Sequence, residues 1–260
     1  MKAQLFQVDA FAERPFEGNP AAVVPLEAFP ADELMQAIAA ENNLSETAFL
    51  VPNGKAWGLR WFTPLSEVDL CGHATLASAH VLFHELGVTR EALHFDTRSG
   101  RLTVRRDGKA LQMDFPRWPV RPLTTDPGIG AALGADPTEV HDTGACLMAV
   151  FDDEAAVLAL TPDMRAVAAL HPFGLIVTAP GRSQDFVSRF FAPAVGIDED
   201  PVTGSTHCAL TPFWAARLGK STLTARQISA RGGELECELR GDRVLLRGRA
   251  VTVIESTLRL

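Results

Sequence analysis

The feature that most constrains this chain is a segment that occurs twice, in two imperfect copies. The first copy covers residues 69–79 (DLCGHATLASA) and the second covers residues 200–210 (DPVTGSTHCAL). Each copy places a glycine, Gly72 or Gly204, at the start of a stretch whose apolar residues have helical spacing. Such a repeat predicts a chain built from two similar halves, with a cleft between them as the natural place for chemistry.

The match extends beyond the two copies. Each helical stretch ends at a second glycine, Gly87 or Gly219, and the number of residues between the two glycines is the same in both copies. Upstream, the run RWFTP at residues 60–64 is answered by RFFAP at residues 189–193. We therefore expect a strand, a loop and one long helix to follow each other in each half.

The remaining pattern predicts an α+β fold in which each half wraps a mixed sheet on its long helix. Strands and helices do not alternate one to one, and no Gly-x-Gly-x-x-Gly follows a strand, so a doubly wound nucleotide-binding fold is not expected. The proline-rich stretch 116–137 predicts the crossing between the halves. We expect helices over residues 32–43, 72–86, 154–170 and 205–218, and strands over residues 4–11, 23–24, 44–51, 59–62, 93–96, 102–105, 111–115, 146–151, 175–178, 186–191, 222–230, 235–239, 243–246 and 251–254.

Charge and cysteine content exclude several classes of protein. A net charge of −8 argues against sequence-independent binding of nucleic acid, which needs a basic face. No apolar run has the length that a membrane span needs, and the first residues lack a signal-peptide core. The four cysteines have neither zinc-site nor redox-pair spacing. The sequence therefore predicts a reduced, cytoplasmic protein without disulfides.

Glu46 is the first candidate for chemistry. It lies in the run LSETAFLV at residues 44–51, among apolar side chains where a carboxylate is least at home. Burial favours the neutral form of a carboxyl group, which suits such a group to moving protons. The alternative is that Glu46 caps a turn or forms a surface ion pair, as most lone acids do.

The two glycines suggest a binding site for an anion. A predicted helix start leaves backbone N–H groups free, and glycine lets a ligand approach them closely. Two such helix starts favour a carboxylate or a developing enolate oxygen. The alternative is ordinary N-capping by Asp69 and Ser205. The equal spacing of the copies favours ligand binding at Gly72 and Gly204.

Three further features lie in or near the repeat. His73 is the only histidine that we place directly at a helix start, where it suits proton transfer or hydrogen-bond donation. Asp200, before Pro201, either orients a protonated group or starts a turn. His80 and His84 have the i, i+4 spacing of a metal-binding pair, but no third ligand follows in the sequence, and we predict no metal site.

Cysteines at the repeat leave thiol chemistry open. A cysteine at a helix N-terminus has a depressed pKa and can act as a base or nucleophile. Cys71 has this position in the first copy. Cys208 is the weaker candidate, because it falls one turn inside its predicted helix.

Four ordered motifs run through the chain: QVDAF with GNPAAV at residues 7–11 and 18–23, NLSET at 43–47, CGHAT at 71–75 and DPVTGS at 200–205. Together they closely resemble the phenazine-biosynthesis-like isomerase family, over essentially the whole chain. The resemblance implies the diaminopimelate-epimerase-like fold: two pseudo-symmetric domains, each a curled mixed sheet around a central helix, with the active site between them.

The same resemblance implies domains over residues 1–117 and 118–260, with the last strand, 251–260, able to return to the first domain. It also implies proton transfer without a cofactor. In the phenazine enzyme a glutamate moves a proton within a dihydroxylated anthranilate ring, assisted by a histidine, an aspartate and a serine. These roles map onto Glu46, His73, Asp200 and Ser205, and the predicted substrate-binding residues of the motifs are Asn19, Ser45, Gly72, Gly204 and Thr206.

Related epimerases use two cysteines as opposed acid and base. Cys71 takes the place of one, but the other place falls near Thr203, which argues against a two-thiol epimerase. We expect an isomerase of a small carboxylate-bearing substrate, with no cofactor, and a homodimer. The alternatives are a non-catalytic protein that binds small anions at the helix starts, and an enzyme that depends on Cys71. The substrate itself does not follow from the fold.

Overall fold

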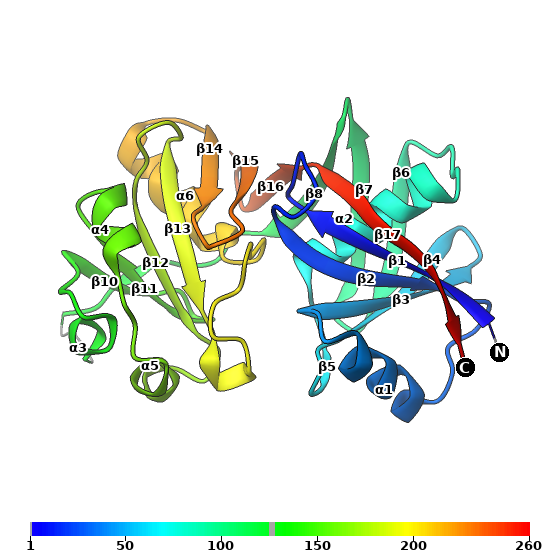
Figure 1. The fold of residues 1–260 in the computed structure, drawn as a ribbon. Coiled ribbons are helices and arrows are strands. Elements are labelled where there is room, and N and C mark those ends of the chain that lie inside the picture. Colours follow the sequence, from blue (N-terminus) through cyan, green and yellow to red (C-terminus); the bar gives the residue numbers. More distant parts are fainter. Residues whose placement is uncertain (1, 125–127) are drawn as a thin grey trace. The chain divides into compact units, whose positions relative to one another are not determined.

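The computed structural model describes residues 2–124 and 128–260 and divides them into two compact units (Figure 1). Unit 1 consists of residues up to 114 together with residues 247–260, and unit 2 consists of residues 115–246. The last strand thus belongs to the same unit as the first. Among the residues described, no helix is long and apolar enough to cross a membrane.

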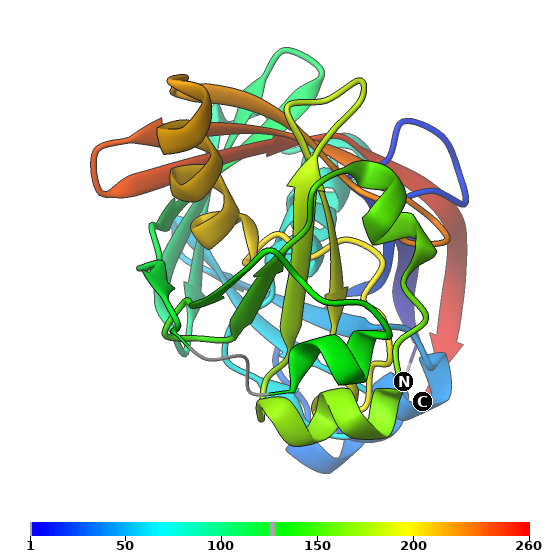
Figure 2. The ribbon, with the colours of Figure 1, turned by 90° about the vertical axis from the view of Figure 1, so that its left-hand side faces the viewer.

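Unit 1 is a mixed sheet whose strands pair in the order β17, β1, β2, β3, β4, β6, β7, β8, with the short β5 added to β4. The β2–β3 and β4–β6 pairs are parallel and the others are antiparallel. The two ends of the chain lie side by side because Lys2 pairs with Arg259 (Figures 1 and 2). The strands are β1 (Lys2–Ala10), β2 (Asn19–Pro25), β3 (Glu46–Asn53), β4 (Ala56–Phe62), β5 (Glu67–Val68), β6 (Ala92–Thr97), β7 (Gly100–Asp107), β8 (Ala110–Pro116) and β17 (Ala250–Arg259).

The central helix of unit 1 is α2 (Gly72–His80), which continues as the π-helix η1 (Val81–Glu85). The predicted helix over residues 72–86 is correct in extent, but its last turn is wider than an α-helical turn. Residues 72–79 are all buried, and α2 contacts β1, β2, β3 and β17. Outside the sheet, α1 (Asp32–Asn42) ends at Asn43 in the left-handed conformation, as the Asn42-Asn43 pair predicts.

Unit 2 repeats this pattern of pairing. The β10–β11, β12–β13 and β14–β15 pairs are antiparallel, the β11–β12 and β13–β14 pairs are parallel, and β9 adds to β10. Antiparallel and parallel pairs therefore alternate as they do from β1 to β7. The strands are β9 (Arg121–Pro122), β10 (Glu139–Asp142), β11 (Leu147–Val150), β12 (Leu175–Pro180), β13 (Phe186–Phe191), β14 (Thr222–Gln227), β15 (Gly233–Arg240) and β16 (Arg243–Gly248).

The central helix of unit 2 is α6 (His207–Leu218), which contacts β14 and β15 (gold in Figure 2). It begins two residues later than predicted, because residues 204–206 form a turn before it. Trp214 on α6 donates a hydrogen bond from Nε1 to Thr178 Oγ1 (2.9 Å) and stacks on Phe186. The helix ends at Gly219 in the left-handed conformation, and in unit 1 Gly87 has the same conformation just after η1.

Two predictions for unit 2 are wrong in detail. The helix expected over residues 154–170 is two helices, α4 (Glu154–Ala159) and α5 (Met164–Leu170). Pro162 lies between them, and the Asp163 side chain caps the start of α5 by accepting from two backbone N–H groups. The stretch expected to be a bare crossing contains β9 and α3 (Ile129–Leu133); residues 125–127 of that stretch lie outside the described residues.

The upstream match between RWFTP and RFFAP corresponds to an arginine–glutamate ion pair in each unit. Arg60 on β4 makes a two-pronged ion pair with Glu67 (2.7 and 2.6 Å). Arg189 on β13 makes the same pair with Glu199 (2.8 and 3.0 Å), which follows the 3-10 helix η2 (Pro193–Val195). Each pair fixes the loop that leads to the central helix. The α+β fold with one buried central helix in each half is confirmed.

Candidate active site

Unit 1 brings a buried carboxylate and an imidazole together. Glu46 is the first residue of β3, His73 is the second residue of α2, and the helix packs on that strand. Glu46 Oε2 lies 2.9 Å from His73 Nε2, and the two residues are 9% and 4% exposed. The contact is an ion pair, and no described group other than His73 lies against Oε2 as a donor. One buried acceptor therefore stays available to a ligand.

Asn19 completes this cluster from β2. Its side-chain Nδ2 lies 3.2 Å from Nδ1 of His73, and the residue is fully buried as the first of its strand. The Asn19 side chain therefore lies at Nδ1, and Nε2 of the ring faces Glu46. Two predicted substrate-binding residues lie beside the cluster: half-buried Ser45 precedes Glu46, and Gly72 precedes His73.

His73 is held in its charged form. Burial alone would lower its pKa, but the sulfur of Cys71 and the carboxylate of Glu46 both favour the imidazolium. The two neighbours outweigh the burial, and the pKa of His73 lies above the usual 6.5. The cluster therefore combines an imidazolium with the buried carboxyl group of Glu46.

The expectation of a depressed thiol pKa at Cys71 is wrong. Cys71 Sγ lies 3.5 Å from Nδ1 and 4.0 Å from Nε2 of His73. Burial, followed by the nearby charge of Glu46, raises the pKa of Cys71 to about 11 in spite of the helix start. Cys208 is the second residue of α6 rather than one turn inside it, and burial raises the pKa of its thiol as well. Both thiols are protonated at neutral pH.

The start of α2 has free donors. The N-cap position belongs to Cys71, and no side chain caps the helix there, so the alternative that Asp69 caps it is wrong. In the described parts of the chain, the backbone N–H groups of Gly72 and His73 donate to no acceptor. They lie on the turn that carries the imidazolium, which makes this helix start an anion-binding position.

Unit 2 has its own buried polar network around the second copy of the repeat. Asp200 accepts a short hydrogen bond from the Thr203 hydroxyl. Gln227, which is fully buried at the end of β14, accepts from the Thr203 backbone N–H (2.8 Å) and donates to the Asp200 carbonyl (2.6 Å). The side chain of one glutamine thus ties both ends of the turn that precedes Gly204.

The turn of residues 204–206 presents donors in the same way as the start of α2. Within residues 128–260, the backbone N–H groups of Gly204, Ser205 and Thr206 have no acceptor. Thr206 occupies the N-cap position without a side-chain cap, so capping of α6 by Ser205 is also wrong. The structure therefore gathers Asp200, Gly204, Ser205 and Thr206 on one turn of unit 2, and Glu46, His73 and Asn19 in one cluster of unit 1.

His207 corrects a further expectation, because His73 is not the only histidine at a helix start. His207 is the first residue of α6, fully buried, with Nδ1 2.9 Å from the Thr203 carbonyl. Burial lowers its pKa to about 4, so it is neutral where His73 is charged. Its role is to hold the turn rather than to supply charge.

Sequence reasoning missed Asp9 and Gln227. Buried Asp9 accepts the backbone N–H of Phe16 (2.7 Å), which holds the β1–β2 loop next to Asn19. Gln227 had a readable signal, since the alternation of β14 places it on the same buried face as Leu223 and Ala225. A polar residue at an inward position of a strand is expected to have polar partners.

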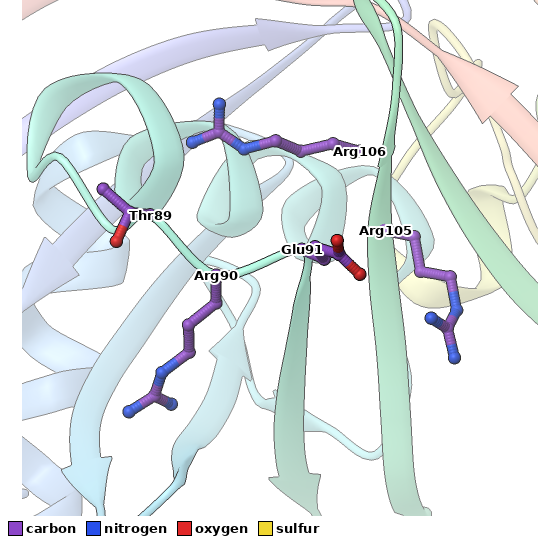
Figure 3. Close-up of a pocket in the computed structure, with 5 residues that line it drawn as sticks. All are labelled: Thr89, Arg90, Glu91, Arg105 and Arg106. Carbon is purple, nitrogen blue, oxygen red and sulfur yellow. The ribbon is translucent and has the colours of Figure 1, made fainter.

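A hollow elsewhere in unit 1 does not coincide with any predicted site residue. It has a volume of about 450 Å³ and is lined by Thr89, Arg90, Glu91, Arg105 and Arg106. Figure 3 shows that the three guanidinium groups point in different directions. Arg90 donates to the Lys55 carbonyl, and Arg106 donates to the Phe83 and Val88 carbonyls. Arg90 and Arg106 are engaged with the backbone, and the three guanidinium groups do not converge on a ligand.

Known proteins match this chain over its whole length. A model of the phenazine biosynthesis-like protein family matches residues 8–256. An uncharacterized isomerase of Pseudomonas aeruginosa is 54% identical over the full length of both chains. A crystal structure of a PhzF-family phenazine biosynthesis protein from Enterococcus faecalis superposes with a TM-score of 0.97 at 48% identity, again over the whole of both chains.

A structure with lower sequence identity has a similar fold. A predicted epimerase of Pseudomonas aeruginosa, 24% identical, superposes with a TM-score of 0.77 over 98% of this chain and 99% of its own. At that identity the likeness concerns the fold alone. The predicted epimerase-like fold is thereby confirmed.

Proposed function

This chain belongs to the phenazine biosynthesis-like protein family, and on that premise we propose that it is an isomerase that moves a proton within a small carboxylate-bearing substrate without a cofactor. The observation that carries the proposal is the buried pair of Glu46 and His73, in which a carboxylate oxygen without a hydrogen-bond donor lies 2.9 Å from an imidazole. A proton carrier needs such an oxygen free to receive a proton from a ligand.

In the proposed reaction Glu46 is the general base and then the general acid. Its carboxylate takes a proton from one carbon of the substrate, the bonding electrons of that carbon spread toward the substrate carboxylate, and the same proton returns to another carbon. The atoms of substrate and product are the same, so no further reactant is needed. Burial of Glu46 limits loss of the proton to water while the intermediate exists.

His73 balances the charge that develops. Its imidazolium lies 2.9 Å from the carboxylate that takes up the proton and then returns it. The free N–H groups of Gly72 and His73 suit the negative oxygen of an enolate or carboxylate. A charged His73 is thus a stabilising group in this proposal, and Glu46 is the group that moves the proton.

Asp200 and Ser205 are proposed to assist from unit 2, as the family resemblance implies. The turn that carries them is rigid, because Gln227 and Thr203 bind it at both ends. We propose that Ser205 and the free N–H groups of residues 204–206 bind the substrate, and that Asp200 orients them. That residues of both units act on one substrate remains a prediction.

The test is a solvent-deuterium exchange screen. Wild-type protein and the Glu46→Gln variant are incubated in heavy water with a panel of small unsaturated and amino carboxylates, and the ligands are read by NMR and mass spectrometry. The proposal expects deuterium at carbon in the wild type and none in the variant. Exchange that survives Glu46→Gln would place the base elsewhere and overturn the assignment.

A second candidate is a non-catalytic protein that binds small anions. The free N–H groups at the two helix starts favour it as much as they favour an enzyme. In that case a carboxylate would stabilise the protein against heat, and no carbon-bound proton would exchange. An enzyme that depends on Cys71 has less support, because the raised pKa keeps this thiol protonated.

A further inference from the structure

We propose that Glu46, Cys71 and His73 form a binding site for a zinc ion, and that zinc bound there stops proton transfer by Glu46; the second half of this inference rests on the proposed function. The three residues are buried, and one ligand atom from each lies within 4.8 Å of the other two. They are the only group of three such ligands in the part of the chain that the structure describes.

The distances fit a tetrahedral ion with small adjustments. Zinc bonds of about 2.0 Å to nitrogen and oxygen and about 2.3 Å to sulfur place neighbouring ligand atoms roughly 3.3 to 3.6 Å apart. Glu46 Oε2 and His73 Nε2 are 2.9 Å apart, and Cys71 Sγ and Nε2 are 4.0 Å apart. All three ligand atoms lie within 4.8 Å of one another, so movements of about 1 Å bring them to the expected values.

One observation beyond the spacing of the three ligands supports a site. The buried Oε2 of Glu46 has no hydrogen-bond donor, so an ion that enters replaces only its ion pair with His73 Nε2. With three protein ligands, the fourth position of the ion stays open to water or substrate.

The choice of metal follows from the ligand atoms. A thiolate, an imidazole and a carboxylate suit zinc and cobalt, whereas magnesium prefers an all-oxygen shell. On binding, the Cys71 thiol and the His73 imidazolium lose their protons to the buffer, and Glu46 Oε2 becomes a ligand. A carboxylate bound to zinc no longer takes a proton from the substrate.

The test measures metal binding directly on the full chain. Protein stripped with a chelator and kept in a thiol-free reductant is titrated with zinc against a chromophoric competitor, and separately with cobalt for a sulfur-to-cobalt absorption band. We expect one ion per chain and a cobalt band that disappears in Cys71→Ser. Cys71→Ser and Glu46→Gln should each weaken zinc binding by at least roughly 10- to 100-fold, the loss that removal of even a supporting residue causes.

Cys146→Ser is the matched control, because this cysteine is equally buried but lies outside the cluster. It should bind zinc as the wild type does, and magnesium should not compete with zinc. Equal zinc affinity in wild type and Cys71→Ser would overturn the inference. A wild-type zinc affinity no stronger than that of the double variant with both Cys71→Ser and Glu46→Gln would also overturn it. Circular dichroism confirms that each variant is folded.

Failure of this inference and failure of the proposed function are distinguishable. Zinc that binds through Cys71 while proton exchange survives Glu46→Gln would leave the site standing and refute the catalytic assignment. Exchange that depends on Glu46 in a protein without zinc affinity would refute the site alone. If both hold, stoichiometric zinc should abolish the exchange in wild type, and a chelator should restore it.

Discussion

Glu46 Oε2 lies 2.9 Å from Nε2 of His73, although the two residues belong to a strand and a helix that are 27 positions apart in the chain. Both residues are buried, so water cannot take the place of either partner in this contact. A buried charge pair of this kind adds little stability by itself, and loss of one partner leaves the other as an uncompensated buried charge. The pair is therefore better explained by chemistry than by folding.

Glu46→Gln should abolish proton transfer and leave the protein folded. The amide has nearly the volume of the carboxylate but cannot carry the proton, and loss of a general base costs on the order of 10²- to 10⁴-fold in rate. Deuterium exchange into the substrate carbon measures this loss. Glu41→Gln, an exposed acid on α1, is the control and should exchange at the wild-type rate.

His73 should make stability depend on pH above 6.5. Its folded-state pKa is raised above 6.5, so its contribution is complete below that value and is lost as the pH rises through the raised pKa. Urea unfolding of wild type and His73→Asn over a pH series should show a difference that shrinks as the pH rises. Glu46→Gln should weaken this dependence, because Glu46 is one of its causes. A difference that does not change with pH would contradict the charged state.

Cys71 should be unreactive in the free protein. With a thiol pKa of about 11, only about one molecule in ten thousand is a thiolate at neutral pH. Alkylation by iodoacetamide, followed by mass spectrometry, should label Cys71 only slowly in the folded protein, as it labels Cys146, whose pKa burial raises to about 12. Rapid labelling of Cys71 alone would contradict the raised pKa and support an enzyme that depends on Cys71.

The repeat in the sequence predicted more of the fold than any single residue did. Gly87 and Gly219 both end their central helix in the left-handed conformation, and the two arginines of RWFTP and RFFAP make equivalent ion pairs. These features are local, so a pattern of residues encodes them. The break at Pro162 was also local, and the proline rule would have found it.

The polar contacts of the site were beyond sequence patterns. Asn19 meets His73 across 54 positions, and Gln227 meets Thr203 across 24, and no periodicity links such residues. Only the resemblance to a known family singled out Asn19, and nothing singled out Gln227. The state of Cys71 was predicted wrongly because the helix start was visible in the sequence, whereas the burial that dominates its pKa was not.

His207 should destabilise the protein in acid. The pKa of His207 in the folded state is lowered from 6.5 to about 4. As the pH falls through this interval, His207 binds a proton in the unfolded chain but not in the folded one. The shift corresponds to on the order of 3 kcal/mol lost by pH 4. His207→Asn should flatten the fall in unfolding free energy measured by urea between these pH values. His80, with a pKa also lowered to about 4, accounts for a remaining slope.

Gln227 should control the geometry of the unit 2 turn. Gln227→Leu removes the acceptor of the Thr203 N–H and the donor to the Asp200 carbonyl, and buried groups left in this way cost about 1–3 kcal/mol each. Gln227→Glu keeps the acceptor and loses the donor, so it should be intermediate in stability. Gln4→Leu, at an exposed position of β1, is the control and should change the unfolding free energy little.

Measurements of KM and kcat distinguish a purely structural role of Gln227 from a role in positioning the site. If the turn binds substrate through Ser205 and the N–H groups of residues 204–206, Gln227→Glu should raise KM or lower kcat at temperatures where the variant is fully folded. Ser205→Ala should then add little to the Gln227→Glu defect, because both changes disturb the same contact. Independent, additive losses would show that Gln227 stabilises the fold without positioning Ser205.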